Sequence, residues 1–362
     1  MASLREVASH AGVSVATAWR VATGTEGVRP ALRERVERSM RELLYVLPSQ
    51  RPETGVIGLL IPQLSNPVFP AIAAAMETRA SAMGVVSILC NTAGSADREA
   101  EYVHMLLKRQ VDGMVFIAGE SSDLRSDHAH YRRLLDEGAR LVFVNSVADD
   151  LGAPSVGVDP HDAGRQATQH LIDLGHERIG YVAGPAHYTG TREQGAGRRD
   201  ALVAAALDPD AHVSHDADDF SFEAGARGIT RLLDGRGPKP SGVICNNDLM
   251  AVGVLHELAA RRMQVPVDMS VVGFDGIDFT SWTRPSLTTM EQPIDDIAST
   301  AIDALQTMIS EPGRTLPRSS FRARLRVGGS SAAPRSSPAP RRPTVTAPDQ
   351  PFSPPAKRPR TK

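Results

Sequence analysis

The chain has 362 residues, of which 41% are hydrophobic and 23% are charged, and its formal net charge is -2. This length and composition predict a globular protein of two or three domains with a substantial core. The charge excludes a uniformly basic DNA-coating protein, so any affinity for nucleic acid has to come from a localised patch. No apolar stretch is long enough to cross a membrane, and charged Arg5 and Glu6 stand where a secretory signal needs an apolar core. We therefore expect a cytoplasmic protein without a membrane partner.

Residues 3–21 carry the pattern of two short helices joined by a tight turn. Ser3 followed by Glu6 forms a capping-box pattern, and apolar side chains recur after it at helical spacing. Gly12 can adopt the positive φ of a sharp helix exit, and the Ser14 hydroxyl can cap the next helix. The pattern predicts a helix-turn-helix whose second helix reads DNA. The alternative is an ordinary helical hairpin at the edge of a larger domain.

A third helix is predicted from about Pro30 to Leu44. Its apolar residues fall on one face, and arginines occupy much of the remaining surface. Three helices close a small core, so residues 1–47 are expected to form an all-α helix-turn-helix head. The arginines of this head are the candidate basic patch.

From about Gly55 the sequence alternates short β-rich runs with longer amphipathic helical runs, which is the pattern of repeated βαβ units. The predicted strands are 56–61, 85–90, 113–117, 141–144, 179–182, 242–245 and 271–274. Their continuous apolar runs suit parallel sheets that are covered on both faces. Cys90 and Cys245 lie in two of these runs, which favours free thiols over a disulfide. Ligands of such sheets bind at the carboxyl ends of the strands, where this chain carries polar residues.

Several motifs follow one another in the order of a known family. They are Val7-Ala8 through Val21, Ser65-Asn66-Pro67 with Phe69, Val158-Asp159, residues 170–179, Asn247-Asp248 with Met250-Ala251 and Gly253, residues 270–275 and residues 284–289. On these motifs the chain, from Ser3 to about Val327, closely resembles the LacI/GalR family of transcription regulators. The resemblance implies an all-α head and an α/β core like that of periplasmic binding proteins. In such a core, two doubly wound parallel-sheet subdomains hold a small molecule between them.

The resemblance also implies the domain boundaries. After the head, residues 48–54 form a shortened, Pro-containing hinge, and residues 55–328 form the effector-binding and dimerisation core. Its N-subdomain is expected at about 55–157 and 287–313, and its C-subdomain at about 158–286 and 314–328. Residues 329–362 are rich in Pro, Ser, Ala and Arg, which predicts a disordered basic tail. The tail either adds weak, salt-sensitive attraction to DNA or has no role.

The resemblance assigns Val15, Ala16 and Arg20 to base reading in the major groove. An arginine pairs bidentately with guanine, and the two apolar residues offer contacts to thymine methyl groups. Ser14 and Thr17 suit phosphate contacts, which fix the register of the head without reading sequence.

Two features of the DNA-binding part depart from the family. Trp19 replaces the usual serine, and its indole either donates a hydrogen bond to a phosphate or covers apolar surface of the head. The hinge contains Pro48 and Pro52, which interrupt a helix, and no leucine stands where the family inserts one into the minor groove. We expect this wedge to be missing and Arg51 to act as an extended minor-groove arm.

Eight residues match or lie near the family's ligand-contacting positions: Asn66, Phe69, Asn145, Asp159, Arg192, Phe220, Asn247 and Asp275. Carboxylates, amides and an arginine bridge paired hydroxyls, and an aromatic ring covers an apolar sugar face, so a sugar or sugar-like effector is predicted. The alternative for a single polar residue is a strand-end cap or a domain-closing hydrogen bond. The glycine spacing after Arg192 differs from the family pattern, which leaves a neighbouring residue as the alternative there.

The chain lacks the usual signatures of enzymes. No Gly-x-Gly-x-x-Gly follows the first strand, no Walker loop or Gly-x-Ser-x-Gly elbow is present, and the 11 histidines are scattered. We therefore expect no enzymatic activity, no cofactor and no metal. A sugar-binding protein of the periplasmic type is the alternative, and the head and the missing signal peptide argue against it.

The sequence as a whole predicts a cytoplasmic bacterial transcription regulator, expected to be a repressor that associates with the nucleoid when it is bound to DNA. Its partners are expected to be a pseudo-palindromic operator, a second copy of the chain and a sugar-type effector. The effector would control operator affinity allosterically. Whether the effector weakens or strengthens DNA binding is not readable from the residues.

Overall fold

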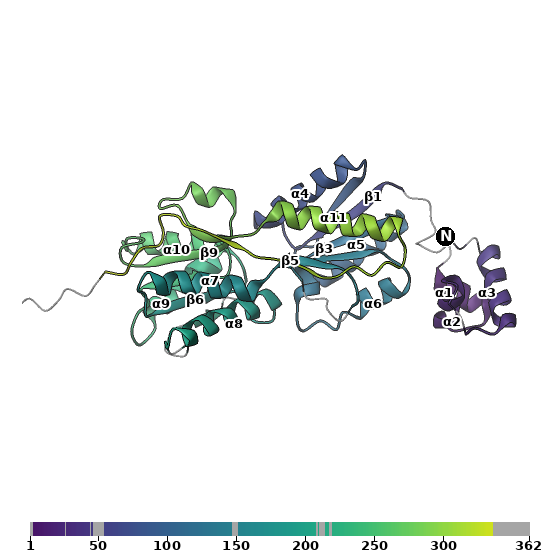
Figure 1. Ribbon diagram of the computed structural model, residues 1–362, viewed down its shortest axis with the longest axis horizontal. Helices are drawn as coiled ribbons and strands as arrows, with labels where there is room; N and C mark the ends of the chain where they lie inside the picture. Colours follow the sequence, from purple (N-terminus) through teal and green to yellow (C-terminus); the bar gives the residue numbers. More distant parts are fainter. Residues whose placement is uncertain are drawn as a thin grey trace, which may run out of the picture.

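The computed structural model describes residues 3–25, 27–43, 45, 54–146, 151–207, 209, 214–216 and 219–335. A small helical head lies at one end of an elongated molecule, and two α/β subdomains follow along the long axis (Figure 1). The expected fold class, an all-α head and a core of two doubly wound sheets, is confirmed. Arg51 and residues 48–53 of the predicted hinge lie outside the described residues.

The head consists of α1 (Leu4–Ala11), α2 (Val15–Ala22) and α3 (Pro30–Glu42). Both halves of the capping box form, because the backbone N–H of Glu6 donates to Ser3 Oγ and that of Ser3 donates to the Glu6 carboxylate. Gly12 ends α1 with a φ of 63°. Ser14 then caps α2 by accepting a hydrogen bond from the N–H of Thr17. The local signals in the sequence therefore produce the predicted turn.

The first subdomain contains a six-stranded parallel sheet with the spatial order β11-β5-β4-β3-β1-β2. Its strands are β1 (Val56–Ile61), β2 (Val86–Asn91), β3 (Gly113–Ile117), β4 (Leu141–Val144), β5 (Ser155–Val158) and β11 (Ser319–Phe321). Four helices cover it: α4 (Val68–Ala82), α5 (Ala96–Lys108), α6 (Ala129–Asp136) and α11 (Ile294–Ser310). Leu59 and Ile61 pack in the layer of α4 and α11, whereas Leu60 packs in the layer of α5 and α6. Burial on both faces explains why the strands are continuous apolar runs.

The second subdomain repeats this architecture with the order β12-β10-β9-β8-β6-β7. Its strands are β6 (Ile179–Ala183), β7 (Ser214–Asp216), β8 (Gly242–Cys245), β9 (Ser270–Asp275), β10 (Thr288–Glu291) and β12 (Arg324–Arg326), of which only β12 is antiparallel to its neighbour. The covering helices are α7 (Pro160–Asp173) and α8 (Thr189–Ala204) on one face and α9 (Phe222–Asp234) and α10 (Asp248–Ala260) on the other. Cys90 and Cys245 are buried free thiols, as expected.

The chain crosses between the subdomains after β5, after β10 and after β11. The second and third crossings differ from the boundaries expected at 287 and 314. β10 pairs with β9 and belongs to the second subdomain, and β11 pairs with β5 and belongs to the first. These strands read Thr-Thr-Met-Glu and Ser-Ser-Phe, so they lack the apolar runs by which strands were predicted.

The ordered core also extends further than the expected tail boundary at 329. The N–H of Val271 donates to the carbonyl of Ser330, and the Ser330 hydroxyl donates to the carbonyl of Val271. Arg335 pairs with Asp268 at 3.2 Å. Small polar residues of this segment satisfy backbone groups beside β9, a role that its composition does not reveal. Residues 336–362 of the predicted tail lie outside the described residues.

Helices α7 and α8 approach each other at two glycines. A Cβ atom on Gly164 would lie 2.2 Å from the carbonyl oxygen of Gln194, and one on Gly197 would lie 1.9 Å from that of His161. Backbone atoms cannot move aside as a flexible side chain can, so both positions require glycine.

We predict that Gly197→Ala destabilises the protein by about 1–3 kcal/mol or more, because the added methyl group forces α7 and α8 apart. Gly190 in the same helix is the matched control, since its Cβ would meet nothing within 4 Å. Gly190→Ala is expected to leave stability unchanged or to raise it by ~0.5 kcal/mol. Urea denaturation measures both changes, and equal stability of the two variants would contradict the close helix contact.

Candidate functional site

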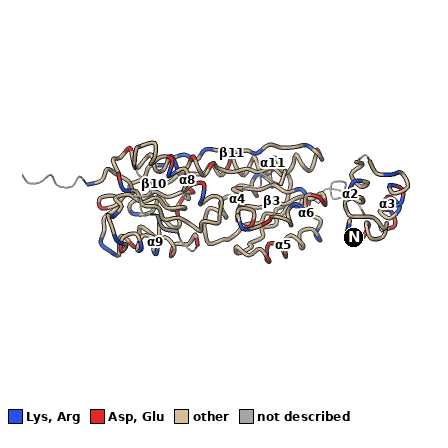
Figure 2. The backbone as a smooth tube through the Cα atoms, turned by 90° about the horizontal axis from the view of Figure 1, so that it is seen from below, with Lys and Arg blue, Asp and Glu red and all other residues tan. Residues whose placement is uncertain are grey.

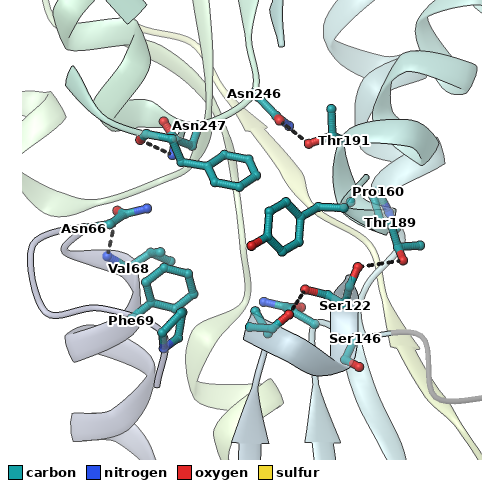
Figure 3. A pocket seen from close by; sticks show the side chains of 18 of the residues that line it. Asn66, Val68, Phe69, Ser122, Ser146, Pro160, Thr189, Thr191, Asn246 and Asn247 are labelled. Atoms are coloured by element: carbon teal, nitrogen blue, oxygen red, sulfur yellow. Dashed lines mark hydrogen bonds between the residues drawn. The ribbon is translucent and has the colours of Figure 1, made fainter. Parts of the chain in front are cut away.

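A cavity of about 390 Å³ lies between the two subdomains, at the carboxyl ends of their strands. Figure 3 shows Asn66 and Phe69 on one side of it and Thr191, Asn246 and Asn247 on the other. This is where ligands of doubly wound sheets bind. Six of the eight predicted effector residues line it: Asn66, Phe69, Asn145, Phe220, Asn247 and Asp275.

The other two predicted effector residues do not line the cavity. The Asp159 carboxylate caps α7 by accepting a hydrogen bond of 3.0 Å from the N–H of Asp162. Arg192 is exposed on α8, and Thr191 and Gln194 of the same helix face the cavity instead. Adjacent helical residues point about 100° apart, so a shift of one position moves a side chain off the facing surface. The cavity wall is therefore formed by neighbours of Arg192 on α8 rather than by Arg192 itself.

The three predicted asparagines of the cavity wall already bond to the protein, and Asn66 Oδ1 accepts a hydrogen bond from the N–H of Val68 at 3.4 Å. Asn247 accepts a hydrogen bond from the N–H of Met250 at 2.7 Å and donates to the carbonyl of Phe220 at 3.1 Å. Asn145 donates to Gln292 Oε1 at 2.9 Å and accepts from the N–H of Val158 at 3.2 Å. These are the capping and domain-closing bonds that the sequence left open as the alternative role.

Asp275 retains an unused acceptor. Its Oδ1 accepts a hydrogen bond from Gln292 Nε2 at 2.7 Å, whereas its Oδ2 is buried without a hydrogen-bond partner. Burial and the neighbouring carboxylate of Asp248 raise the pKa of Asp275 well above its ordinary value. A buried oxygen without a hydrogen-bond partner is costly, which is one reason why the protonated carboxyl is favoured here.

Aromatic rings supply the apolar part of the cavity. The rings of Tyr188 and Phe220 lie 5.3 Å apart in the second subdomain, and Phe69 lines the cavity from the first. Gly184 makes room for Phe220, because a Cβ there would lie 2.1 Å from the ring. Burial raises the pKa of Tyr188, so its hydroxyl is a neutral donor at neutral pH. Polar groups beside aromatic faces form the combination that holds a polyhydroxylated ring.

Sequence reasoning missed a polar network at this end of the second sheet. Asn246 Oδ1 accepts hydrogen bonds from the N–H of Gly184 and from Thr191 Oγ1, at 2.8 and 2.7 Å. Its Nδ2 donates to Gln194 Oε1 at 2.7 Å. Thr191 and Gln194 are three residues apart in a helix and therefore share a face. This three-residue spacing is the sequence signal from which a shared polar face could have been predicted.

The subdomains also touch beside the cavity. The N–H of Leu124 donates to the carbonyl of His187 at 2.8 Å, and Thr189 Oγ1 donates to the carbonyl of Ser122 at 3.2 Å. Ser122, His187 and Thr189 all line the cavity. One side of the cleft is therefore bridged by direct bonds from one subdomain to the other (Figure 3).

The helix predicted to read DNA presents the predicted residues outward. Ser14, Val15, Ala16 and Arg20 are exposed, whereas Ala18 and Val21 are buried in the core of the head. Thr17 is half-buried, and its hydroxyl lies 2.9 Å from that of Ser14.

Trp19 is half-buried and packs against the core of the head, which is the covering role of the two that the sequence left open. The basic residues of α3 alternate with acidic ones, as Figure 2 shows, and Arg38 pairs with Glu34 at 3.5 Å. The positive charge of α3 is thus partly compensated.

An exposed recognition helix and a cavity shared by two α/β subdomains define a ligand-responsive DNA-binding protein. Residues 3–47 match the family model of bacterial regulatory proteins of the lacI family, and residues 168–331 match a periplasmic binding protein-like domain. The chain is 36% identical to a relative described as an uncharacterized HTH-type transcriptional regulator in the aml 5' region of Streptomyces limosus. That match covers 91% of this chain and 94% of the relative. The chain therefore belongs to the LacI family, and it is a transcriptional regulator.

Solved structures agree with this assignment. A complex of the transcriptional regulator CelR with cellobiose has a TM-score of 0.69 and 28% identity, covering 91% of this chain and 100% of that one. A lac repressor dimer bound to operator and an anti-inducer has a TM-score of 0.68 and 25% identity, covering 92% of this chain and 99% of that one. In the part of the chain that the structure describes, no helix is long and apolar enough to span a membrane.

We predict that Asp275→Asn raises the stability of the protein at neutral pH. Because the folded-state pKa of Asp275 is raised, its protonated form favours folding below the ordinary Asp pKa, and this contribution is lost as pH rises toward the folded-state value. The asparagine has no such charge, and its oxygen can still accept from Gln292.

Thermal unfolding of both proteins between about pH 5 and pH 7 checks this prediction. The midpoint of the variant relative to wild type should rise with pH across this window. A constant difference would show that Asp275 titrates normally.

Proposed function

We propose that this protein is a homodimeric repressor whose affinity for a pseudo-palindromic operator is set by a sugar or sugar-like metabolite in the inter-subdomain cavity. It acts in the cytoplasm, where it has access to the operator DNA, and it has no enzymatic role. The observation that carries the proposal is the presence in one chain of a helix that exposes residues 14–16 and 20 and a cavity whose walls come from two subdomains. Occupancy of such a cavity favours one arrangement of its walls over another.

In this proposal, Val15, Ala16 and Arg20 read bases in the major groove, and Ser14 and Thr17 contact phosphates. The exposure of the first three residues supports their role. Trp19 is assigned to the core of the head rather than to a phosphate, because its ring is already packed. Arg51 remains a proposed minor-groove arm, for which loss of operator affinity in Arg51→Ala is the test.

The proposed effector contacts are the Asp275 side chain, the Asn66 amide and the rings of Phe69, Tyr188 and Phe220. Their combination of acceptors, donors and aromatic faces matches the chemistry of a sugar. The CelR complex supports this class, since a regulator of the same fold binds cellobiose. The cavity volume of about 390 Å³ leaves room for more than one sugar ring.

Dimerisation is proposed on two grounds. The lac repressor, which shares the fold, is described as a dimer bound to its operator. A single head with one short recognition helix contacts few base pairs. In a two-fold dimer, each head binds one half-site, and the two half-sites lie about one helical turn of DNA apart. Sedimentation of the full chain measures the oligomeric state directly.

We predict that the purified protein enriches one pseudo-palindromic sequence from genomic DNA fragments at physiological salt. Arg20→Ala should weaken binding to that sequence by ~1–3 kcal/mol, or about 5- to 150-fold, and relax its specificity at one position. Arg38→Ala is the matched control, because Arg38 lies on α3 and pairs with Glu34. Salt-sensitive binding without any sequence preference would contradict the regulator proposal and favour the sugar-binding alternative.

We also predict that a panel of sugars that includes cellobiose and D-ribose contains a ligand that raises the unfolding temperature of the protein and changes its operator affinity. Phe220→Ala should weaken this ligand about tenfold or more, because it removes a stacking face. Phe222→Ala is the control, since Phe222 begins α9 and contacts His256 outside the cavity. Equal losses in both variants would argue against stacking on Phe220.

A further inference from the structure

Gln292 lies at the point where the chain leaves the second subdomain. It directly follows β10, is buried and lines the cavity. Its side-chain Nε2 donates to Asp275 Oδ1 at 2.7 Å, and its backbone N–H donates to the carbonyl of Asp275 at 3.1 Å. Its Oε1 accepts from Asn145 Nδ2 at 2.9 Å. One amide therefore bonds to the carboxyl ends of strands in both sheets.

The Asn145 end of this chain of bonds is fixed in the first subdomain. Asn145 follows β4, and its Oδ1 accepts from the N–H of Val158, the last residue of β5 before the first crossing. Gly157 is required beside it, because a Cβ there would lie 2.6 Å from Asn145 Oδ1. Asn145 has a φ of 51°, in the left-handed region that asparagine tolerates better than most non-glycine residues.

The Asp275 end is fixed in the second subdomain. Asp275 ends β9 with a φ of 129°, and the next two N–H groups, those of Gly276 and Ile277, donate to Asp248 Oδ2 at 2.8 and 3.0 Å. Its Oδ1 bonds to Gln292, and its Oδ2 is buried without a partner. The carboxylate that lines the cavity is thus oriented by the residue at the crossing.

We propose that Gln292 is a positioning residue that ties the cavity carboxylate of Asp275 to the angle between the two subdomains through Asn145. The proposal deepens the proposed function and rests on it, because it names the element through which an effector would act. A ligand that displaces the Asp275 side chain from its place in the cavity wall strains the two amide bonds of Gln292. A turn of one subdomain relative to the other relieves this strain.

The physical basis is the directionality of hydrogen bonds. They weaken steeply when their angle or length departs from the optimum, so a chain of two short bonds between rigid bodies selects a narrow range of inter-body angles. Breaking one bond leaves a buried polar group unpaired, which costs free energy in every arrangement that does not restore it. We call the bonded series Asn145–Gln292–Asp275 the relay. The relay therefore narrows the distribution of angles between the subdomains even without a ligand.

The test measures the distance between spin labels on the two subdomains in the full-length protein without any sugar, by double electron-electron resonance. Glu77→Cys on α4 and Val203→Cys on α8 place labels at exposed positions, and the native thiols are buried. Gln292→Met and Asp275→Ala should each broaden or shift the distance distribution, and the double variant should not exceed the larger single effect. Asp275→Asn, which retains an oxygen for Gln292 to donate to, should keep the wild-type distribution.

Gln63→Met is the matched control, because it removes an amide from the cavity wall without touching the relay. An unchanged distribution in Gln292→Met, or an equal change in Gln63→Met, would overturn the proposal. If Gln292→Met does not fold, the comparison of Asp275→Ala with Asp275→Asn decides, since only the alanine breaks the bond. The measurement needs no effector, so it tests the positioning role separately from the proposed function. If the distance distributions change as expected but no sugar binds, the positioning role of Gln292 is supported and the proposed function is contradicted.

Discussion

The core of this protein depends on one constraint, which is that its cavity belongs to neither subdomain. A wall made from two sheets is complete only at certain angles between them, so ligand contact and subdomain geometry cannot vary independently. Each subdomain must then be rigid enough to move as a body. The glycine contacts between α7 and α8 and between α9 and α10, where Cβ atoms would lie within about 2 Å of backbone oxygens, provide that rigidity.

The fold was predictable from the sequence where burial on both faces requires every residue of a strand to be apolar. The central strands of both sheets are buried on two faces and appear as apolar runs, and the capping box, Gly12 and Ser14 specify the head. The sequence did not predict five strands, which are β5, β7, β10, β11 and β12. β10, β11 and the segment after Val327 are stabilised by long-range pairing of polar residues, and such pairing has no local period that a sequence can display.

The site was predictable by residue type and less so by role. Asp275 and Phe220 lie in the cavity wall, but Asn145 and Asn247 also lie there with their amides bonded to the protein. Strand ends need caps, and the same amides that bind sugars cap strands and helices, so position alone does not separate the two uses. Asp159 and Arg192 do not line the cavity: the carboxylate of Asp159 caps the N-terminus of α7, and the rotation of α8 turns Arg192 toward solvent.

The link between core and head follows from where the linker is attached. Among the described residues, the core of the head is built from residues between Leu4 and Tyr45. The first described residues of the effector core, Thr54 and Gly55, donate their N–H groups to the carboxylate of Asp112 at 2.8 Å, which fixes the start of the core on the first subdomain. The segment that leads from the head therefore enters the core at the first subdomain. In the proposed dimer, a change of subdomain angle that alters the separation of the two first subdomains would also alter the separation of the two heads, and a pseudo-palindrome with fixed half-site spacing is sensitive to that separation. Regulation then requires no change inside the recognition helix, only a change in the distance between two copies of it.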